Sequence, residues 1–224
     1  MSSGAYVVGV PVLRRIALLT VIWAGLVGLF AAAGELITRS AAVTDFDHGA
    51  TRDVVSSRTA ALNAAMKAVT WLGSWVALVV AAAVIALLVL KKRLPVLAAV
   101  VAVAAWAGEA LGVHIVKDTV ARHRPPQAIW LMTAHGWSFP SGHTATASVA
   151  FTVLALTVAA LARQRVIRVL GWMVAGLAIA ATGFSRVELG VHWTTDVLAS
   201  VIFVAAWLTA IAITLGGRLR PPQR

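Results

Sequence analysis

Uninterrupted apolar runs of about 20 residues restrict this chain's fold more than any other feature, because a helix of that length crosses the hydrocarbon core of a bilayer. Backbone hydrogen bonding limits spanning structures to helices and closed barrels, and these runs are too long and continuous for barrel strands. We therefore predict an all-α polytopic membrane protein with a bundle of six transmembrane helices, in which residues 1–224 form a single domain. The predicted spans are residues 16–37, 71–90, 95–116, 141–161, 169–184 and 196–215.

The composition favours the same class. Hydrophobic residues make up 60% of the chain and charged residues only 12%, far less charge than a soluble domain of this length carries. The first apolar run contains three consecutive alanines that resemble a signal-peptidase site, but its length favours a retained helix. In the third span, Glu109 and His114 are each expected to make a polar contact inside the bundle.

A polar stretch, residues 38–68, separates the first two spans. From Thr51 onward its apolar residues recur at helical spacing with basic residues between them, which predicts an amphipathic helix lying on the membrane surface. The acidic and histidine residues just before it lie in a turn-like segment, where a helix cap is favoured over a metal site; they are Asp45, Asp47 and His48.

The distribution of charge predicts the orientation. The net charge is +11, and with six spans one side of the membrane holds both termini and the loops 91–93 and 163–168. These segments contain eleven Lys and Arg residues and no Asp or Glu, so the positive-inside rule makes this side cytoplasmic. We expect the basic surface to contact anionic lipids. No nucleic-acid partner is expected, because no nucleic-acid motif or phosphate-binding loop accompanies the charge.

Residues 185–196 form a polar break between two apolar runs and contain Arg186, His192 and Asp196. Such groups are costly near hydrocarbon, so the cluster suggests function. The spacing of four would place His192 and Asp196 on one helical face. The carboxylate could then accept the Nδ1–H and leave Nε2 available as nucleophile or base, while Arg186 is suited to binding phosphate. The segment alone fits a helix cap with a buried ion pair equally well.

A second polar group follows the third span and reads Lys117-x6-Arg124-Pro125. Both cations could bind an anion, although cations at a span end are commonly snorkelling side chains. Proline disfavours helix at the residue before it, so we expect the chain to leave the helix near Arg124.

A third group, Pro140-Ser141-Gly142-His143, opens the fourth span. Ser141 is a good N-cap residue, Gly142 allows close approach of a ligand, and a helix N-terminus attracts anions. A capped helix with a surface histidine explains this group equally well when it is taken alone.

The predicted topology places the three groups together. The third and fifth spans end, and the fourth and sixth begin, on the same side of the membrane, so all three groups lie at one level. Three cations, two histidines, an aspartate and a helix N-terminus at one level are typical of a phosphate site with acid and base partners.

These residues resemble the signature of the type-2 phosphatidic acid phosphatase superfamily, which is K-x6-R-P, then P-S-G-H, then S-R-x5-H-x3-D. All three motifs match in residue type, order and spacing. The resemblance implies that His192 is the nucleophile, that Asp196 orients it, and that His143 first protonates the leaving group and then activates water. It also implies catalysis without a metal ion or cofactor. The implied phosphate-binding residues are Lys117, Arg124, Ser141, Gly142 and Arg186.

The resemblance further implies a lipid phosphate substrate at the extracytoplasmic face of a bacterial cytoplasmic membrane. Undecaprenyl diphosphate is favoured, followed by phosphatidylglycerophosphate and phosphatidate. A lipid phosphotransferase and a non-catalytic lipid-binding or transport protein are the alternatives. The soluble haloperoxidases of the same superfamily are disfavoured by the hydrophobic spans. Trp130, Trp137 and Trp193 either line a lipid entrance or belong to an interfacial aromatic belt.

Overall fold

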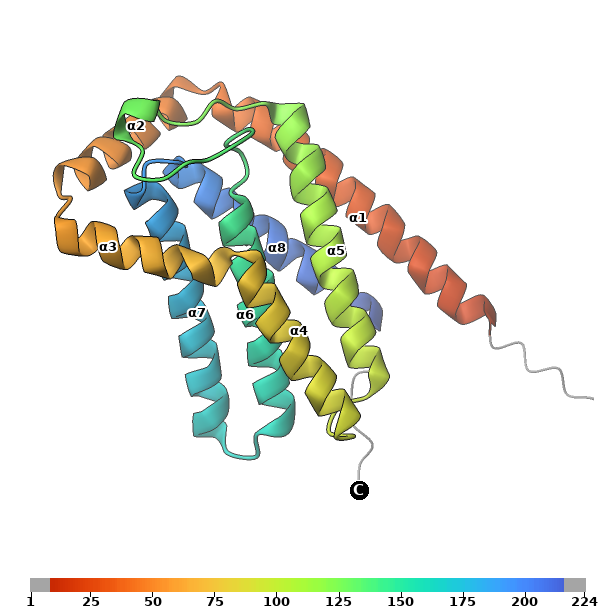
Figure 1. Ribbon diagram of the computed structural model, residues 1–224. Helices are drawn as coiled ribbons and strands as arrows, with labels where there is room; N and C mark the ends of the chain where they lie inside the picture. Colours follow the sequence, from red (N-terminus) through yellow and green to blue (C-terminus); the bar gives the residue numbers. More distant parts are fainter. Residues whose placement is uncertain (1–8, 216–224) are drawn as a thin grey trace, which may run out of the picture.

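The computed structural model describes residues 9–215, and this part of the chain is built from helices (Figure 1). The all-α prediction is therefore confirmed. Arg218, Arg220 and Arg224, which contributed to the predicted orientation, lie outside the described residues. In chain order the helices are α1 (Gly9–Thr38), α2 (Ala41–Ser56), α3 (Ala60–Val69), the 3-10 helix η1 (Thr70–Gly73), α4 (Trp75–Leu90), α5 (Val96–Val120), the 3-10 helix η2 (Gln127–Ile129), α6 (Gly142–Leu161), α7 (Arg165–Glu188) and α8 (Thr194–Leu215).

Within residues 9–215, five helices are long and apolar enough to cross a membrane. A sixth candidate is a pair of helices, Ala60–Gly73 and Trp75–Leu90, bent by 47° at the break between them. Large apolar side chains are exposed on these helices, as expected for surfaces that face lipid. The chain is an integral membrane protein. Exposed examples on α7 are Val169, Leu170, Met173, Val174 and Leu177.

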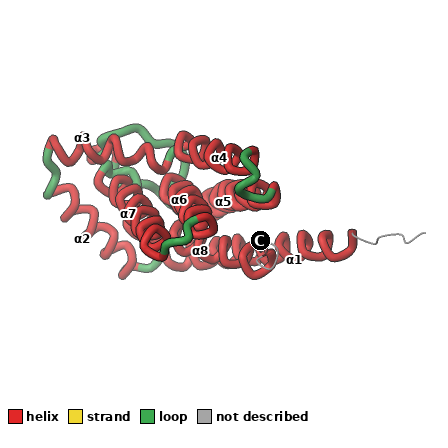
Figure 2. The backbone as a smooth tube through the Cα atoms, turned by 90° about the horizontal axis from the view of Figure 1, so that it is seen from below, coloured by secondary structure: helices red, strands yellow, loops and turns green. Residues whose placement is uncertain are grey.

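The centre of the bundle is α6, which packs against α4, α5, α7 and α8. The long α1 packs against α5 and α8 and extends away from the other helices in the view from below (Figure 2). Close packing of α5 on α8 depends on two glycines. A Cβ on Gly108 would lie 2.6 Å from the ring of Trp207, and one on Gly112 would lie 2.5 Å from that of Phe203.

The basic loops and the signature motifs lie at opposite ends of the bundle. The α4–α5 and α6–α7 connections lie at the lower edge of Figure 1, whereas residues 121–141 and the α7–α8 connection lie at the upper end. The start of α1 is joined to the end of α8 by a hydrogen bond of 2.8 Å from Arg15 Nη1 to the Thr214 carbonyl. In the described part of the chain, the basic loops and the signature motifs are therefore at opposite ends of the bundle, as the sequence predicted.

Several expected boundaries were wrong. The turn-like segment before Thr51 is helical, and α2 and α3 replace the single surface helix. Asp47 lies inside α2, fully buried and ion-paired, and does not cap its own helix. The helix α4 begins at Trp75 rather than at Trp71, because Ser74 caps it through its side chain. The fifth span continues to Glu188, since its last turn is buried by neighbouring elements that the local sequence does not reveal.

The two polar residues of the third span lie in different environments. Glu109 is buried inside the bundle, and the polar contact expected of it stays a prediction. His114 is exposed, and its Nε2 lies 3.5 Å from Oδ2 of Asp118 on the same helix, so its predicted place inside the bundle was wrong.

Gly190, in the α7–α8 connection, has φ +74°, and an added Cβ would lie 2.5 Å from the Ile129 carbonyl oxygen. Gly136 has φ +66° and open space around it. Gly136→Ala should therefore cost only the strain of the left-handed conformation, about 1–2 kcal/mol, whereas Gly190→Ala must also displace the neighbouring backbone. We expect thermal unfolding in detergent to show a clearly larger fall in Tm for Gly190→Ala. Equal falls would contradict this account.

Candidate active site

The three sequence motifs meet at the upper end of the bundle, where their side chains come from the ends of different helices. Lys117 lies in the last turn of α5 and Arg186 in the last turn of α7. His143 and Asp196 lie in the first turns of α6 and α8. The chain leaves α5 at Ala121, which has a left-handed conformation, so Arg124 lies in the following connection, as expected.

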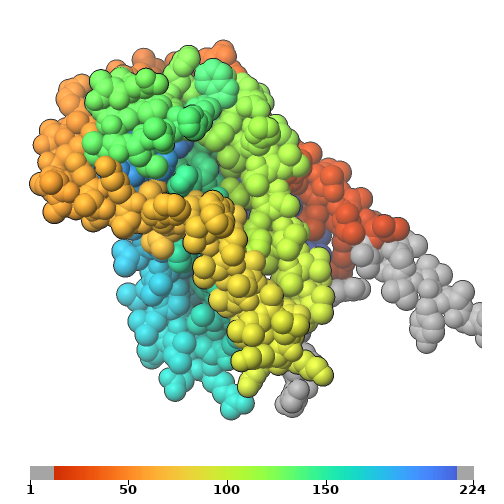
Figure 3. Space-filling model, in the orientation of Figure 1, coloured from red at the N-terminus to blue at the C-terminus, as the bar shows by residue number. Residues whose placement is uncertain are grey.

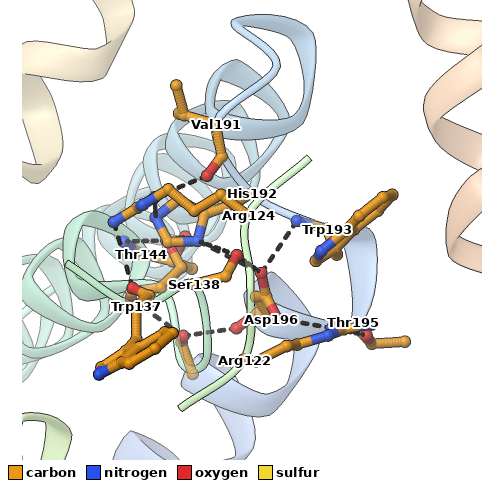
Figure 4. Close-up of polar contacts among 12 residues, drawn as sticks. Arg122, Arg124, Trp137, Ser138, Thr144, Val191, His192, Trp193, Thr195 and Asp196 are labelled. Atoms are coloured by element: carbon orange, nitrogen blue, oxygen red, sulfur yellow. Dashed lines mark hydrogen bonds and ion pairs between the residues drawn. The ribbon is translucent and has the colours of Figure 1, made fainter. Parts of the chain in front are cut away.

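His192 and Asp196 face each other, with His192 Nδ1 3.4 Å from Asp196 Oδ2 (Figure 4). The predicted pairing is thus present, although the expected helical spacing was wrong, because α8 begins only at Thr194. Oδ2 also accepts hydrogen bonds from the Trp193 backbone N–H at 2.9 Å and from the Ser138 hydroxyl at 2.5 Å. The carboxylate is therefore fixed in front of the imidazole.

The other imidazole nitrogen of His192, Nε2, lies 3.0 Å from Arg124 Nη1. With the Nδ1 proton directed to Asp196, Nε2 carries the lone pair and accepts from the guanidinium. Arg124 is held in place by four backbone carbonyls, those of Val191 at 2.6 Å, His135 at 2.8 Å, Gly136 at 2.9 Å and Trp137 at 3.2 Å. Its cationic side chain thus lies directly beside the candidate nucleophile.

His192 is held in its neutral form. Burial lowers the pKa of His192 to about 3, and the cations of Arg124 and Lys117 act in the same direction, while the hydrogen bond and charge of Asp196 oppose them. The His192 side chain is therefore neutral at physiological pH, and Nε2 keeps a lone pair that can attack once Arg124 moves from it to a bound phosphoryl group.

The other two cations of the motifs have different hydrogen-bond partners. Lys117 Nζ donates to the backbone carbonyls of Trp137 at 2.6 Å and Ser138 at 3.3 Å. Arg186 is only 2% exposed, and its Nη1 donates to the Thr70 hydroxyl at 2.7 Å. Its Nε is buried and has no hydrogen-bond partner among the described residues. Arg186 therefore has a donor available for an anion.

Ser141 fixes the start of α6. Its hydroxyl accepts from the Thr144 hydroxyl at 3.0 Å and lies 3.5 Å from the Thr144 backbone nitrogen. Its own backbone N–H donates to the Asp196 carbonyl at 3.2 Å, which ties the starts of α6 and α8 together. The next two residues, Gly142 and His143, line an adjacent cavity.

This cavity has a volume of about 570 Å³ and opens between α3, η1, α4 and the start of α6. In Figure 3 it lies near the orange α3 segment, below the green connection that precedes α6. Trp71 and Trp75, which are 59% and 70% exposed, lie at its rim. Its lining residues are Lys67, Thr70, Trp71, Gly73, Ser74, Trp75, Met132, Gly142, His143 and Thr146.

The tryptophans expected at a lipid entrance do not line this cavity. Trp193 is only 7% exposed, and its indole N–H donates to the His123 carbonyl at 2.9 Å. The indole N–H of Trp130 donates to the Pro125 carbonyl at 2.8 Å. These two side chains therefore hydrogen-bond to the backbone of the connection after α5.

Three residues that sequence reasoning missed are part of the site. Ser138 donates to Asp196, and Arg122 forms an ion pair with Asp196 Oδ1 at 2.6 Å. Asp47 binds the other side of Arg122 at 2.7 Å. Arg122 had one sequence signal, its position two residues before Arg124, whereas Asp47 had been interpreted as a helix cap. Among the described residues, no three His, Cys, Asp or Glu side chains form a group that could hold a metal ion.

The chain is similar to known proteins in both sequence and fold. A family model described as the PAP2 superfamily matches residues 94–220. Phosphatidylglycerophosphatase B of Bacillus subtilis (strain 168) is 36% identical over 85 residues, which are 38% of this chain and 41% of that protein. The alignment thus spans about two fifths of the length of this relative.

Two solved structures share the fold. The crystal structure of a transmembrane PAP2 type phosphatidylglycerolphosphate phosphatase from Bacillus subtilis has a TM-score of 0.75 and 23% identity, covering 88% of this chain and 97% of that one. That of Aquifex aeolicus LpxE has a TM-score of 0.53 and 23% identity, covering 75% of this chain and 93% of that one. Both likenesses support the helical fold.

The burial of His192 leads to a prediction that needs no substrate. Because burial lowers its pKa to about 3, below the ordinary value near 6.5, the neutral form should persist as the pH falls from 8 to 5. We expect the ¹⁵N resonances of His192, identified by their loss in His192→Ala, to stay unchanged over this range in detergent. Titration of these resonances between pH 6 and pH 7 would contradict the assignment.

Proposed function

This chain belongs to the PAP2 superfamily, and we propose that it is a lipid phosphatase that acts through a phosphohistidine intermediate. One observation carries the proposal. The Nε2 atom of His192 lies 3.0 Å from a fixed arginine, and the other nitrogen of the same imidazole faces a buried carboxylate, which favours the tautomer with Nε2 unprotonated. This arrangement suits a nucleophile that attacks phosphorus beside a cation that binds the phosphoryl oxygens.

In the first step the Nε2 lone pair of His192 forms a bond to phosphorus, and the bond from phosphorus to the leaving oxygen breaks. His143 gives its proton to that oxygen, so that the lipid leaves as an alcohol or as a lipid monophosphate. Asp196 stabilises the positive charge that develops on the His192 imidazole. Lys117, Arg124 and Arg186 bind the phosphoryl oxygens, on which the transition state concentrates negative charge.

In the second step His143, now neutral, takes a proton from water as the water oxygen attacks phosphorus. The bond between phosphorus and Nε2 breaks, inorganic phosphate leaves, and His192 returns to its neutral form. Fixed side-chain cations neutralise the phosphoryl charge in both steps, so the proposed reaction needs no metal ion or cofactor. Ser141 and Gly142, at the start of α6, contribute through the N-terminal backbone of that helix.

The cavity beside His143 supports a membrane lipid as the substrate. It is bounded by exposed tryptophans of η1 and α4, and it contains Lys67 at the edge of the bundle. Tryptophan and lysine are typical of the headgroup level of a bilayer. A lipid held there by its chains would present its phosphate to the cations around His192.

The substrates to be tested first are undecaprenyl diphosphate and phosphatidylglycerophosphate, followed by phosphatidate. The sequence favoured the first, whereas a sequence relative and a structural match are both named for the second. We also propose that residues 1–224 form one membrane-embedded domain in a bacterial cytoplasmic membrane. The site would face outward and both termini would be cytoplasmic, because the basic α4–α5 and α6–α7 loops lie at the opposite end.

The activity can be tested on purified protein in detergent with EDTA present. We expect the wild type to release phosphate from at least one of the three lipids, and His192→Ala to lose this activity by at least about a thousandfold, because the nucleophile is gone. His114→Ala is the matched control, since this exposed histidine of α5 pairs with Asp118 and should leave the rate unchanged.

Rapid acid-free quenching with ³²P-labelled lipid should trap labelled protein that is stable to alkali and labile to acid, as expected for phosphohistidine. Absence of phosphate release from all three lipids by folded protein would reject the phosphatase. Transfer of the label to a second lipid instead of to water would identify a phosphotransferase.

The lipid entrance makes a separate prediction. Trp75→Ala should raise KM for the long-chain substrate several-fold while leaving the hydrolysis of a short, water-soluble phosphate ester unchanged, because only the lipid chains contact the cavity rim. Trp172→Ala is the control, since this exposed tryptophan lies on α7 and does not line the cavity. Equal effects of Trp75→Ala on both substrates would show that the cavity is not the entrance.

A further inference from the structure

A buried chain of charges continues from Asp196 away from His192. Arg122 Nη1 donates to Asp196 Oδ1 at 2.6 Å, and Arg122 Nη2 donates to Asp47 Oδ2 at 2.7 Å. Both carboxylates are fully buried, and the Arg122 side chain is only 9% exposed. Asp47 comes from α2, which precedes the segment that matches the family model. This helix therefore reaches the site from outside the matched segment.

Neighbouring groups fix each member of the chain. Asp47 Oδ1 accepts from the Thr195 backbone N–H at 3.0 Å, and Arg122 Nη1 also donates to the Thr195 hydroxyl at 2.8 Å. The Arg122 guanidinium lies 5.6 Å from the centroid of the Trp193 ring. The ring of His48, also from α2, packs against the same tryptophan at 4.8 Å between centroids. The contacts of α2 thus extend to Trp193 and Thr195, which both lie between His192 and Asp196 in the chain.

The two oxygens of Asp196 have separate roles. Oδ1 is bound by Arg122, whereas Oδ2 accepts from Ser138 and from the Trp193 backbone and faces His192. The ion pair on Oδ1 sets the rotation of the carboxylate and so directs Oδ2 at Nδ1. Because the imidazole turns with its hydrogen-bond partner, Arg122 acts on the direction of Nε2 without touching the reacting phosphate.

Charge balance explains why a second carboxylate is present. Arg122 alone would neutralise Asp196 and leave no net charge to stabilise a positive imidazole. With Asp47 included, the three groups carry a net charge of −1 next to neutral His192. When His192 becomes a positively charged phosphoimidazolium, this buried cluster becomes neutral.

We propose that Asp47 and Arg122 are positioning residues for the reaction, so that α2 sets both the direction and the charge of the catalytic pair. The proposal rests on the proposed function for its kinetic consequences, but not for its structural ones.

The kinetic test compares Asp47→Asn with Asp45→Asn, an exposed aspartate on the same helix. We expect Asp47→Asn to lower kcat about 10- to 100-fold with little change in KM, and Asp45→Asn to have no effect. In an Asp196→Asn background, Asp47→Asn should cause no further loss, because its effect passes through Asp196. Unchanged kcat, or the same fold-loss in both backgrounds, would overturn the proposal.

Arg122→Lys provides a second variant in case Asp47→Asn fails to fold. Lysine keeps the charge but cannot bind two carboxylates with the fixed geometry of a guanidinium. We expect a similar loss of kcat in protein that still unfolds in one cooperative thermal transition, and a wild-type kcat would count against the proposal.

A structural readout separates this inference from the proposed function. The ¹⁵N shifts of the His192 ring report its tautomer and its hydrogen bond to Asp196, whether or not any lipid is hydrolysed. We expect Asp47→Asn to move these shifts toward a mixed tautomer while Asp45→Asn leaves them unchanged. If the wild type hydrolyses no lipid, the proposed function fails, and these shifts alone test whether Asp47 positions His192. Unchanged shifts in Asp47→Asn would overturn the positioning role.

Discussion

Burial of the Asp196 carboxylate is the constraint on which the upper end of this bundle depends. A buried carboxylate costs several kcal/mol unless each oxygen is paired, and here every partner comes from a different part of the chain. Arg122 follows α5, Ser138 precedes α6, and Trp193 precedes α8. Satisfying one carboxylate therefore brings three connections together, and the candidate nucleophile His192 lies where they meet.

The helices below Asp196 hold these three connections in place. α6 is surrounded by four other helices, and the close approach of α5 to α8 at Gly108 and Gly112 brings the ends that carry Lys117 and Asp196 near each other. The same ends carry the polar groups because the spans alternate in direction. Membrane insertion and site assembly are thus two results of one topology.

Much of this was predictable from sequence, and the remainder has a physical explanation. Apolar runs of about 20 residues predict spans whatever surrounds them, and the motif spacing predicted the facing of His192 and Asp196. Asp47 could not be recognised, because its role depends on Arg122, 75 residues away in the chain. Local sequence around Asp47 resembles any polar segment between two spans. Likewise, the place of Trp71 and Trp75 at the rim of the cavity depends on the 47° bend between η1 and α4, which the sequence did not predict.

The carbonyl groups around Arg124 and Lys117 have a consequence for turnover. These cations already donate to the backbone oxygens of residues 135–138, which present partial negative charge much as phosphoryl oxygens do. An arriving phosphate must therefore exchange with these carbonyls, and the gain in binding is only the difference between the two sets of contacts. When inorganic phosphate departs, the same carbonyls can return at once. In the proposed reaction, the loop would thus compete with inorganic phosphate for these cations and favour release of the product.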